Sequence, residues 1–420
     1  MAAMSSGCEP YGPEGLPLEE ARQRILTALT QRPPASPDTI PLAEALGRVL
    51  AQPVQATAAV PGFRASIMDG YALAGAVMPE PGQSWQLRGR AAPGAPYADH
   101  LEPGQAVRIL TGAPLPAGSG WVLPQELVTT MEADRIQLLR PCGSNPWIRS
   151  ADEEAAAGQE LLPAGARLGP AGLGRLASCG VTSVVVGRQP RLGLLISGDE
   201  LLSPGAVRGA GQIWESNSSL LAALLKRLGY GLSRQLVVPD RPEELRDALA
   251  DLAASCDVVV STGGVSAGDS DWIRPLVAEL GHVEFWKLFL RPGRPFAWGE
   301  VAGRPFFGLP GNPVAAAITA LQLLWPALQR LEGAEPQLLP RLQVQLETPL
   351  RRGPGRPELA RAQLVVGADG ALLARLEGSQ ASSRIGSLQD ADLLLEIPAE
   401  QGALEAGSTL WAQLLRLPIF

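Results

Sequence analysis

The sequence predicts a multidomain protein that combines a three-layer α/β domain, built on a mostly parallel sheet, with separate β domains. Between residues 191 and 330, apolar strand-like runs alternate with segments whose apolar residues recur at helical spacing. The β-branched run Asp257–Ser261 is typical of a parallel strand that is buried on both faces. On either side of this region the chain shows short strand-like runs separated by proline and glycine turns, which indicates β domains.

The segments outside the α/β domain are predicted in chain order. Residues 1–16 lack the basic and apolar pattern of a signal peptide, and we expect a disordered lead-in. Amphipathic helices are expected over residues 16–30 and 40–51. From Pro53 to about residue 139 the pattern predicts a compact β domain. After residue 331 it predicts a small β-barrel or sandwich that holds no concentration of reactive groups.

Four strands of the α/β domain each end in a polar or glycine-rich loop. The first loop carries Asp199 and Glu200, and the second ends at Asp240. The third is rich in glycine and hydroxyl residues, and the fourth is the stiff turn Pro310–Pro313. Because the carboxyl ends of parallel strands meet at one edge of a sheet, these loops are expected to line one ligand site.

The third loop has the composition of a phosphate site. The residues that would supply closely spaced backbone N–H groups are Gly263, Gly264, Ser266 and Gly268. Asp269 and Asp271 follow, and carboxylates beside a phosphate make chemical sense when a divalent cation bridges the two. Ordinary βα turns can have the same composition, but the three neighbouring polar loops favour the phosphate site.

Three cations lie between the third and fourth loops, namely Lys287, Arg291 and Arg294. Isolated charges usually form a solvated basic edge. Here they alternate with aromatic residues beside the phosphate loop, and arginine fits phosphate-like oxygens in a bidentate manner. This segment is therefore a candidate anion site.

The composition excludes several classes of function. A net charge of −7 and a pI near 5.2 argue against nucleic-acid binding. The four cysteines show no Cys-x-x-Cys spacing and the two histidines are isolated, so no zinc site, disulfide framework or histidine-based triad is indicated. No apolar stretch reaches the roughly 18 residues of a membrane span. We expect a reduced, cytoplasmic protein whose chemistry depends on carboxylates, hydroxyls, cations and a bound metal.

Six motifs occur in the order SIMDGYA, RILTGAPLP, ISGDELL, GGVSAGDSDW, FWKLFLRPGRP and LPGNPV. The series resembles the molybdopterin molybdenumtransferase family (MoeA), which is related to the C-terminal part of gephyrin. The resemblance extends over almost the whole chain after residue 16. The resemblance assigns a functional role to the dipeptides Asp69-Gly70 and Thr111-Gly112. Without it, both would be interpreted as ordinary turns.

The resemblance implies a homodimer whose subunits have four domains. An elongated dimerisation domain would combine residues 17–55 and 148–187, and an inserted β domain would cover residues 56–147. The α/β molybdopterin-binding domain would cover residues 188–333 and the C-terminal barrel residues 334–420.

The resemblance also implies the activity. Family members cleave adenylylated molybdopterin with a divalent cation, taken here as Mg²⁺, and insert molybdate into the dithiolene with release of AMP. Partners implied with this are molybdopterin adenylyltransferase and recipient molybdoenzymes. The implied catalytic residues are Asp69, Thr111, Glu154, Glu200, Asp240 and Asp271. The implied substrate-binding residues are Gly263, Gly264, Ser266, Gly268, Lys287, Arg291, Arg294, Pro310, Asn312 and Pro313, and the implied metal ligands are Glu200, Asp269 and Asp271. Which carboxylate binds metal and which orients water stays open at this point.

Two departures from the family pattern bear on activity. In the motif at residues 149–154, Asp152 replaces a glycine and Glu154 replaces an aspartate. The loss of glycine would be harmful if the backbone there needs a positive φ. Arg291 and Arg294 replace lysines. The positive charge is kept, but the planar, bulkier guanidinium group could change the geometry of anion binding.

Two alternative functions stay open. A molybdopterin adenylyltransferase resembles the α/β domain alone, and it lacks the inserted β domain that carries Asp69 and Thr111. A non-catalytic scaffold would bind partners through the α/β and C-terminal domains, as gephyrin does, but it would not need the retained carboxylates. Neither a nucleic acid nor a membrane is expected as a partner.

Overall fold

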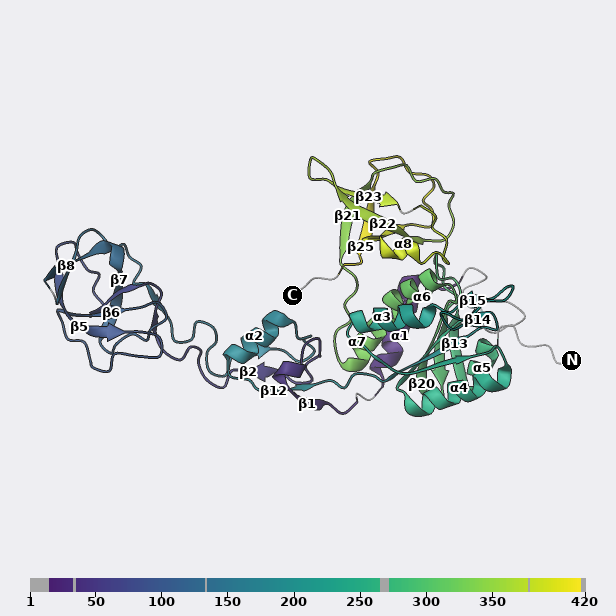
Figure 1. Ribbon diagram of the computed structural model, residues 1–420, viewed down its shortest axis with the longest axis horizontal. Helices are drawn as coiled ribbons and strands as arrows, with labels where there is room; N and C mark the ends of the chain where they lie inside the picture. Colours follow the sequence, from purple (N-terminus) through teal and green to yellow (C-terminus); the bar gives the residue numbers. More distant parts are fainter. Residues whose placement is uncertain (1–14, 33–34, 133, 265–271, 377, 417–420) are drawn as a thin grey trace. The chain divides into compact units, whose positions relative to one another are not determined.

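The computed structural model describes residues 15–32, 35–132, 134–264, 272–376 and 378–416. The chain divides into two compact units (Figure 1). Unit 1 comprises Met1–Thr39, Gly47–Ala51 and Val185–Phe420, and unit 2 comprises Ile40–Leu46 and Gln52–Val184.

Unit 1 is built on a six-stranded sheet. In the order in which they pair, the strands are β16 (Leu232–Val238), β13 (Leu192–Ser197), β17 (Val258–Thr262), β20 (Arg304–Leu309), β19 (Ala297–Val301) and β18 (Gly281–Trp286). The first four run parallel, and β19 and β18 extend the sheet in antiparallel pairs. The prediction of a mostly parallel sheet is confirmed. The prediction that β17 is buried throughout is also confirmed.

Helices cover both faces of this sheet (Figure 1). One face packs against α1 (Leu18–Thr30), α3 (Asn217–Arg227), α6 (Pro313–Thr319) and α7 (Trp325–Glu332), and the other against α4 (Pro242–Ser255) and α5 (Ile273–Leu280). Strand β13 shows the two-sided burial directly, because Leu194 and Ile196 belong to one core and Leu195 to the other. The three-layer prediction is confirmed.

One long helix runs from α6 through a π-helical turn, Ala320–Leu324, into α7. Among the described residues, Pro313–Glu332 is long and apolar enough to cross a membrane, but 89% of its apolar window is buried inside the protein. It is therefore a core helix of unit 1. It ends at Gly333, whose φ of +97° gives the left-handed conformation that commonly terminates helices.

The C-terminal part of unit 1 is a closed barrel, which confirms the predicted small β-barrel. Its strands pair in the order β21 (Arg341–Leu346), β23 (Leu372–Leu376), β22 (Glu358–Val366), β24 (Leu393–Ile397) and β25 (Thr409–Leu414). A short helix, α8 (Gly386–Gln389), lies between β23 and β24 in the chain.

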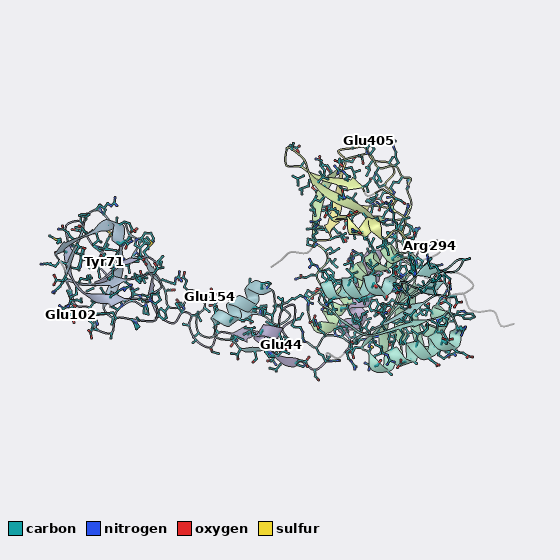
Figure 2. The ribbon with its side chains drawn as sticks, viewed as in Figure 1. Glu44, Tyr71, Glu102, Glu154, Arg294 and Glu405 are labelled. Carbon is teal, nitrogen blue, oxygen red and sulfur yellow. The ribbon has the colours of Figure 1, made fainter. Side chains whose placement is uncertain are left out.

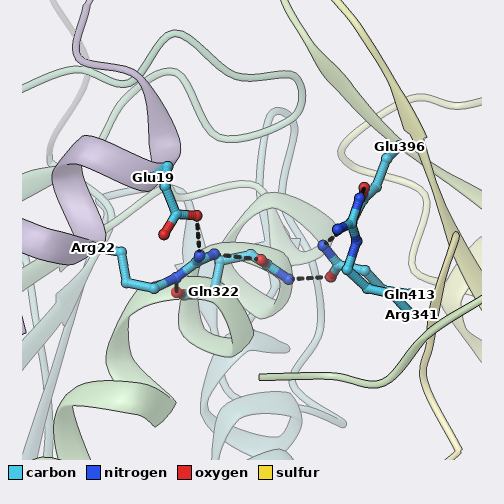
Figure 3. A network of polar contacts seen from close by, with 6 residues as sticks. All are labelled: Glu19, Arg22, Gln322, Arg341, Glu396 and Gln413. Carbon is cyan, nitrogen blue, oxygen red and sulfur yellow. Dashed lines mark hydrogen bonds and ion pairs between the residues drawn. The ribbon is translucent and has the colours of Figure 1, made fainter. Parts of the chain in front are cut away.

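A buried polar network joins helix α1, the π-helical turn and the barrel (Figure 3). Arg22 donates through Nε to the backbone carbonyl of Gln322 and through Nη2 to its side-chain oxygen, both at 3.0 Å. Gln322 donates to Gln413 at 2.7 Å, and Gln413 donates to Glu396, which also pairs with Arg341. Burial lowers the pKa of Arg22. This network helps to fix the barrel against the α/β layers.

Unit 2 contains a curled six-stranded sheet, as predicted for the inserted β domain. Its strands pair in the order β7 (Ser119–Pro124), β4 (Gly70–Ala74), β6 (Gln105–Ile109), β5 (Ser84–Ala91), β9 (Arg135–Leu138) and β8 (Val128–Glu132). Two-stranded pairs and a helix make up the rest, namely β10 (Ile148–Arg149) with β3 (Ala65–Ser66), β11 (Glu160–Leu162) with β2 (Val54–Gln55), and α2 (Pro170–Ser178). A further pair, β1 (Asp38–Pro41) with β12 (Ser183–Val186), is made of residues that are assigned partly to each unit.

The predicted helix over residues 40–51 is wrong. Residues 38–41 form strand β1, followed by one 3₁₀ turn, Leu42–Glu44. Gly47 adopts a φ of +75°, which ends any helical continuation, and Leu50 bridges to Val186. Strand pairing with the returning chain therefore overrides the helical spacing of the apolar residues. Helix α1, which the sequence analysis assigned to the elongated domain, packs on α7 in unit 1.

Candidate active site

The four predicted loops line one cavity of about 1010 Å³ at the carboxyl edge of the unit 1 sheet. The loop residues that line it are Ser197, Gly198, Glu200, Asp240, Thr262, Gly263, Gly264, Pro310, Gly311, Asn312 and Pro313. The convergence predicted from the strand order is confirmed.

The glycine loop after β17 approaches its neighbours closely. Gly263 and Gly264 have φ values of +90° and +62°. A Cβ atom on Gly263 would lie 2.4 Å from the carbonyl oxygen of Ser197, so no larger residue fits without a shift of backbone. The remainder of the predicted loop, including Ser266, Gly268, Asp269 and Asp271, lies outside the described residues.

Buried hydrogen bonds fix the glycine loop to the Pro310–Pro313 turn. Thr262 donates its hydroxyl to the carbonyl of Pro310 at 2.9 Å. Asn217, at the start of α3, donates to Thr262 Oγ1 at 2.9 Å and to the carbonyl of Gly311 at 2.7 Å. Three elements that are distant in sequence therefore hold one rigid wall of the cavity.

Two of the predicted carboxylates, Glu200 and Asp240, line the cavity. Burial, together with the negative charges of Asp199 and Glu200, raises the pKa of Asp240. The Ser197 hydroxyl acts against this shift, but within the described part of the chain Asp240 Oδ1 is buried without a hydrogen bond of good geometry. No group of three or more potential metal-binding side chains occurs among the described residues. Oxygen ligands for a cation are thus available, although the predicted partners Asp269 and Asp271 are not described.

Three guanidinium groups line the cavity, those of Arg291, Arg294 and Arg356. Arg294 lies on the side of the α/β layers that faces the barrel (Figure 2). Arg356 donates to the carbonyl of Leu290 at 2.9 Å, and burial together with the charges of Arg294 and Arg291 lowers its pKa. Mutual repulsion of this kind favours an anion as ligand. Lys287 is not among the described residues that line the cavity, and its backbone adopts a φ of +91°.

The barrel contributes a second part of the cavity wall through Gln380–Ser383 and Ile385. Ser382 accepts a hydrogen bond from Asn312 Nδ2 at 2.9 Å, and its carbonyl accepts one from the N–H of Val314. The C-terminal domain, for which the sequence indicates no concentration of reactive groups, thus contributes polar residues to the cavity wall. Sequence reasoning missed Arg356 and this segment, although the Gly-Arg-Pro turn and the serine pair stand out in an otherwise apolar region.

The other three predicted catalytic residues belong to unit 2. Thr111 donates two hydrogen bonds to Asp69, and both residues are exposed. Glu154 instead accepts a hydrogen bond from Arg175 Nε at 3.0 Å. Asp152 is not among the described residues with a positive φ, so its replacement of glycine causes no backbone strain there.

Three family profiles match the chain in order. They are the MoeA N-terminal region (domain I and II) over residues 16–180, the "probable molybdopterin binding domain" over residues 193–330, and the MoeA C-terminal region (domain IV) over residues 343–415. A molybdopterin molybdenumtransferase of Haemophilus influenzae is 32% identical over 352 residues, which cover 84% of this chain and 87% of that protein. The chain belongs to the MoeA family.

Further relatives support this assignment. Gephyrin of Dictyostelium discoideum is 29% identical to this MoeA family member, and the match covers 86% of this chain but 57% of gephyrin. The crystal structure of the MoeA protein of Pyrococcus horikoshii OT3 superposes with a TM-score of 0.77 at 25% identity, covering 95% of this chain and 99% of that chain. The MoeA resemblance of the six motifs is therefore confirmed, together with the multidomain α/β plus β fold.

Proposed function

We propose that this MoeA family member is a molybdopterin molybdenumtransferase of molybdenum cofactor biosynthesis, which cleaves adenylylated molybdopterin, inserts molybdate and releases AMP. The observation that carries the proposal is the composition of the unit 1 cavity. A glycine cradle, two carboxylates and three guanidinium groups line the same space. This combination suits a substrate that carries a pyrophosphate together with a second oxyanion.

The pyrophosphate of the substrate is proposed to lie on the Gly263–Gly264 loop. Backbone N–H groups can approach an anion there because neither residue has a side chain, and neighbouring groups leave no room for one. Hydrolysis breaks the phosphoanhydride bond, so water supplies the new P–O bond and AMP leaves. Pro310, Asn312 and Pro313 line the same cavity in the turn that is hydrogen-bonded to this loop.

A divalent cation fits the carboxylate side of the cavity. Oxygen ligands are what Mg²⁺ prefers; Glu200 supplies one, and the carboxylate of Asp240 adds negative charge on the same cavity wall. The unpartnered Oδ1 of Asp240 and the raised pKa of this residue indicate negative charge that a cation would relieve. We propose Glu200, with Asp269 and Asp271 from the loop outside the described residues, as ligands. When bound, the cation would neutralise charge that develops on the phosphates.

Molybdate, a substrate rather than a resident group, is proposed to bind among Arg291, Arg294 and Arg356. Guanidinium groups donate paired hydrogen bonds that match tetrahedral oxyanions. Ser382 lines the same cavity from the barrel segment and can add a hydroxyl. We propose that Lys287, which is not among the described residues of the cavity wall, adds positive charge near the molybdate site.

The residues of unit 2 are assigned through a homodimer. We propose that the domain boundaries given above hold apart from helix α1, which packs in unit 1. We also propose that residues 148–187 help to form the dimer, and that Asp69, Thr111 and Glu154 complete the cavity of the partner subunit. The protein would act in the cytoplasm, receive its substrate from a molybdopterin adenylyltransferase and deliver its product to recipient molybdoenzymes.

The direct test supplies purified protein with adenylylated molybdopterin, Mg²⁺ and molybdate, and follows AMP by chromatography. AMP release that requires both added ions is the expected result. If substrate binds but no AMP appears while a control MoeA enzyme is active, the scaffold alternative takes its place. Consumption of ATP with release of pyrophosphate, when the protein is given molybdopterin instead of its adenylylated form, would favour the adenylyltransferase.

A further inference from the structure

A small ribbon leaves the unit 1 sheet after β13 and forms an apolar wall of the cavity. It pairs β14 (Leu201–Leu202) with β15 (Ile213–Trp214) in parallel. Backbone hydrogen bonds from Ile213 to the Glu200 carbonyl and from Glu215 to the Leu202 carbonyl close the ribbon at 2.9 and 2.8 Å. Leu201, Ile213 and Trp214 all line the cavity.

Trp214 stands on this ribbon in a fixed position but remains 46% exposed. Its indole N–H donates to the carbonyl of Ala206 at 2.8 Å. The guanidinium carbon of Arg208 lies 4.1 Å from the ring centroid, so a cation covers one face of the indole. The polar atom of the side chain is thus satisfied within the ribbon, and its exposure is not needed to hydrate the N–H group.

The exposed indole is unusual for its setting. Transfer of an aromatic ring out of water lowers the free energy, and aromatic side chains bury a large apolar area when they leave water. Ile213 beside it is 49% exposed. An apolar surface therefore faces the same cavity as the glycine loop, the carboxylates and the arginines.

Strand order separates Trp214 from the arginine side of the cavity. The ribbon follows β13, the glycine loop follows β17, and the loop with Arg291 and Arg294 follows β18. In the sheet, β17, β20 and β19 lie between β13 and β18. A ligand with a planar ring on the ribbon would therefore reach the glycine loop with its phosphates and the arginine side beyond it.

We propose that Trp214 is the aromatic platform of the cavity, on which a planar heteroaromatic ring of the substrate stacks opposite Arg208. This inference rests on the proposed function, because adenylylated molybdopterin carries two such rings, adenine and pterin. Stacking depends on the π-face that both rings share, so the chemistry of the platform admits either one.

The test measures binding of AMP, of a free pterin and of ribose 5-phosphate by titration calorimetry, with wild type, Trp214→Ala and Trp214→Phe. Trp411→Ala is the matched control. Trp411 is 44% exposed and carries Arg341 at 4.7 Å from its ring, but it lies on β25 of the barrel and is not among the described residues that line the cavity. Thermal unfolding of each variant confirms that it is folded.

The expected result is a loss of about 5- to 100-fold in affinity for one of the two ring ligands in Trp214→Ala, with most of it regained in Trp214→Phe. The affected ligand, AMP or pterin, identifies the ring that stacks. Ribose 5-phosphate, which has no aromatic ring, should bind Trp214→Ala and wild type equally.

Three outcomes overturn the inference. If Trp214→Ala binds both ring ligands as tightly as wild type does, Trp214 does not stack either ring. An equal loss for ribose 5-phosphate, or the same loss in Trp411→Ala, indicates a general structural effect. If wild type binds neither AMP nor pterin, the proposed function fails together with the platform, whereas ring binding that ignores Trp214 leaves the proposed function intact.

Discussion

Thr111 holds Asp69 through a single oxygen atom. Its backbone N–H and its hydroxyl both donate to Asp69 Oδ1, each at 2.8 Å. These hydrogen bonds, with a smaller contribution from the charge of Arg108, lower the pKa of Asp69. Because both residues are exposed, the carboxylate is oriented and ionised while its other oxygen stays available to a ligand.

Thr111→Val should raise the pKa of Asp69 part of the way back, because the hydroxyl donor is lost and the backbone donor remains. A lowered folded-state pKa contributes stability above the unfolded value of about 3.9, and that contribution disappears as pH falls through the folded value. The variant should therefore lose this contribution at a higher pH than wild type. Carboxyl NMR titration checks the shift, with the exposed Thr130→Val on β8 as control. An Asp69 pKa that is the same in wild type and Thr111→Val would contradict the expectation.

Asp240→Asn should stabilise the fold and abolish the proposed activity. The raised pKa means that ionised Asp240 disfavours the folded state at neutral pH, whereas the protonated form below about pH 3.9 does not. In the presence of a chelator at pH 7, the variant should unfold at a higher temperature than wild type, and the difference should shrink in acid. AMP release should fall by ~10²–10³. Lower thermal stability combined with normal turnover would refute both roles.

Gly263→Ala should weaken phosphate binding more than its backbone strain alone explains. The new Cβ would meet the Ser197 carbonyl oxygen at 2.4 Å, so the loop must move. Gly303→Ala is the matched control, since Gly303 has a φ of +75° but no atom within 4 Å of its built Cβ. Both variants should lose about 1–2 kcal/mol of stability from the positive φ. Only Gly263→Ala should also lose AMP affinity, measured by calorimetry, and an equal effect in both would argue against a phosphate cradle.

Mixed dimers test the proposed sharing of residues between subunits. Asp69→Ala and Asp271→Ala should each be inactive alone. If each site takes the first residue from one subunit and the second from the other, a mixed dimer keeps one unmutated site. Random pairing then gives about a quarter of wild-type activity. Demonstrated mixed dimers without activity would mean that each site is built within one subunit.

Local sequence signals predicted the α/β layers because strands, helices and loops alternate over short distances. The loops after β13, β17 and β20 could be assigned to one edge from parallel connectivity alone. The helix prediction for residues 40–51 failed because their conformation depends on distant parts of the chain. Their apolar spacing is helical, but pairing with strand residues more than 130 positions away decides their conformation.

Arg356 and Ser382 could not be predicted for a related reason. They reach the cavity only because the barrel packs beside the Arg291 loop, where the N–H of Arg291 donates to Pro357 and that of Leu359 donates to Arg291. No pattern of residues within the barrel sequence predicts that the barrel packs against the Arg291 loop. Lys287 shows the converse, because its position within the basic motif did not predict that its backbone turns at a φ of +91° and that it stands apart from the described cavity wall.

The most direct test of the central claim is the molybdate dependence of AMP release in Arg291→Ala. Arg291 is half-exposed in the cavity and pairs at 3.6 Å with the buried Glu358, so thermal unfolding of Arg291→Ala is measured first to verify that the variant is folded. Arg246→Ala is the matched control, because Arg246 is an exposed, ion-paired arginine on α4 outside the described cavity wall. The account predicts that Arg291→Ala raises the half-saturating molybdate concentration by about 10- to 100-fold, the loss expected of a charged hydrogen-bonding pair, while its affinity for adenylylated molybdopterin and the behaviour of Arg246→Ala stay close to wild type. AMP release that does not depend on molybdate, or a molybdate requirement that Arg291→Ala leaves unchanged, would contradict it.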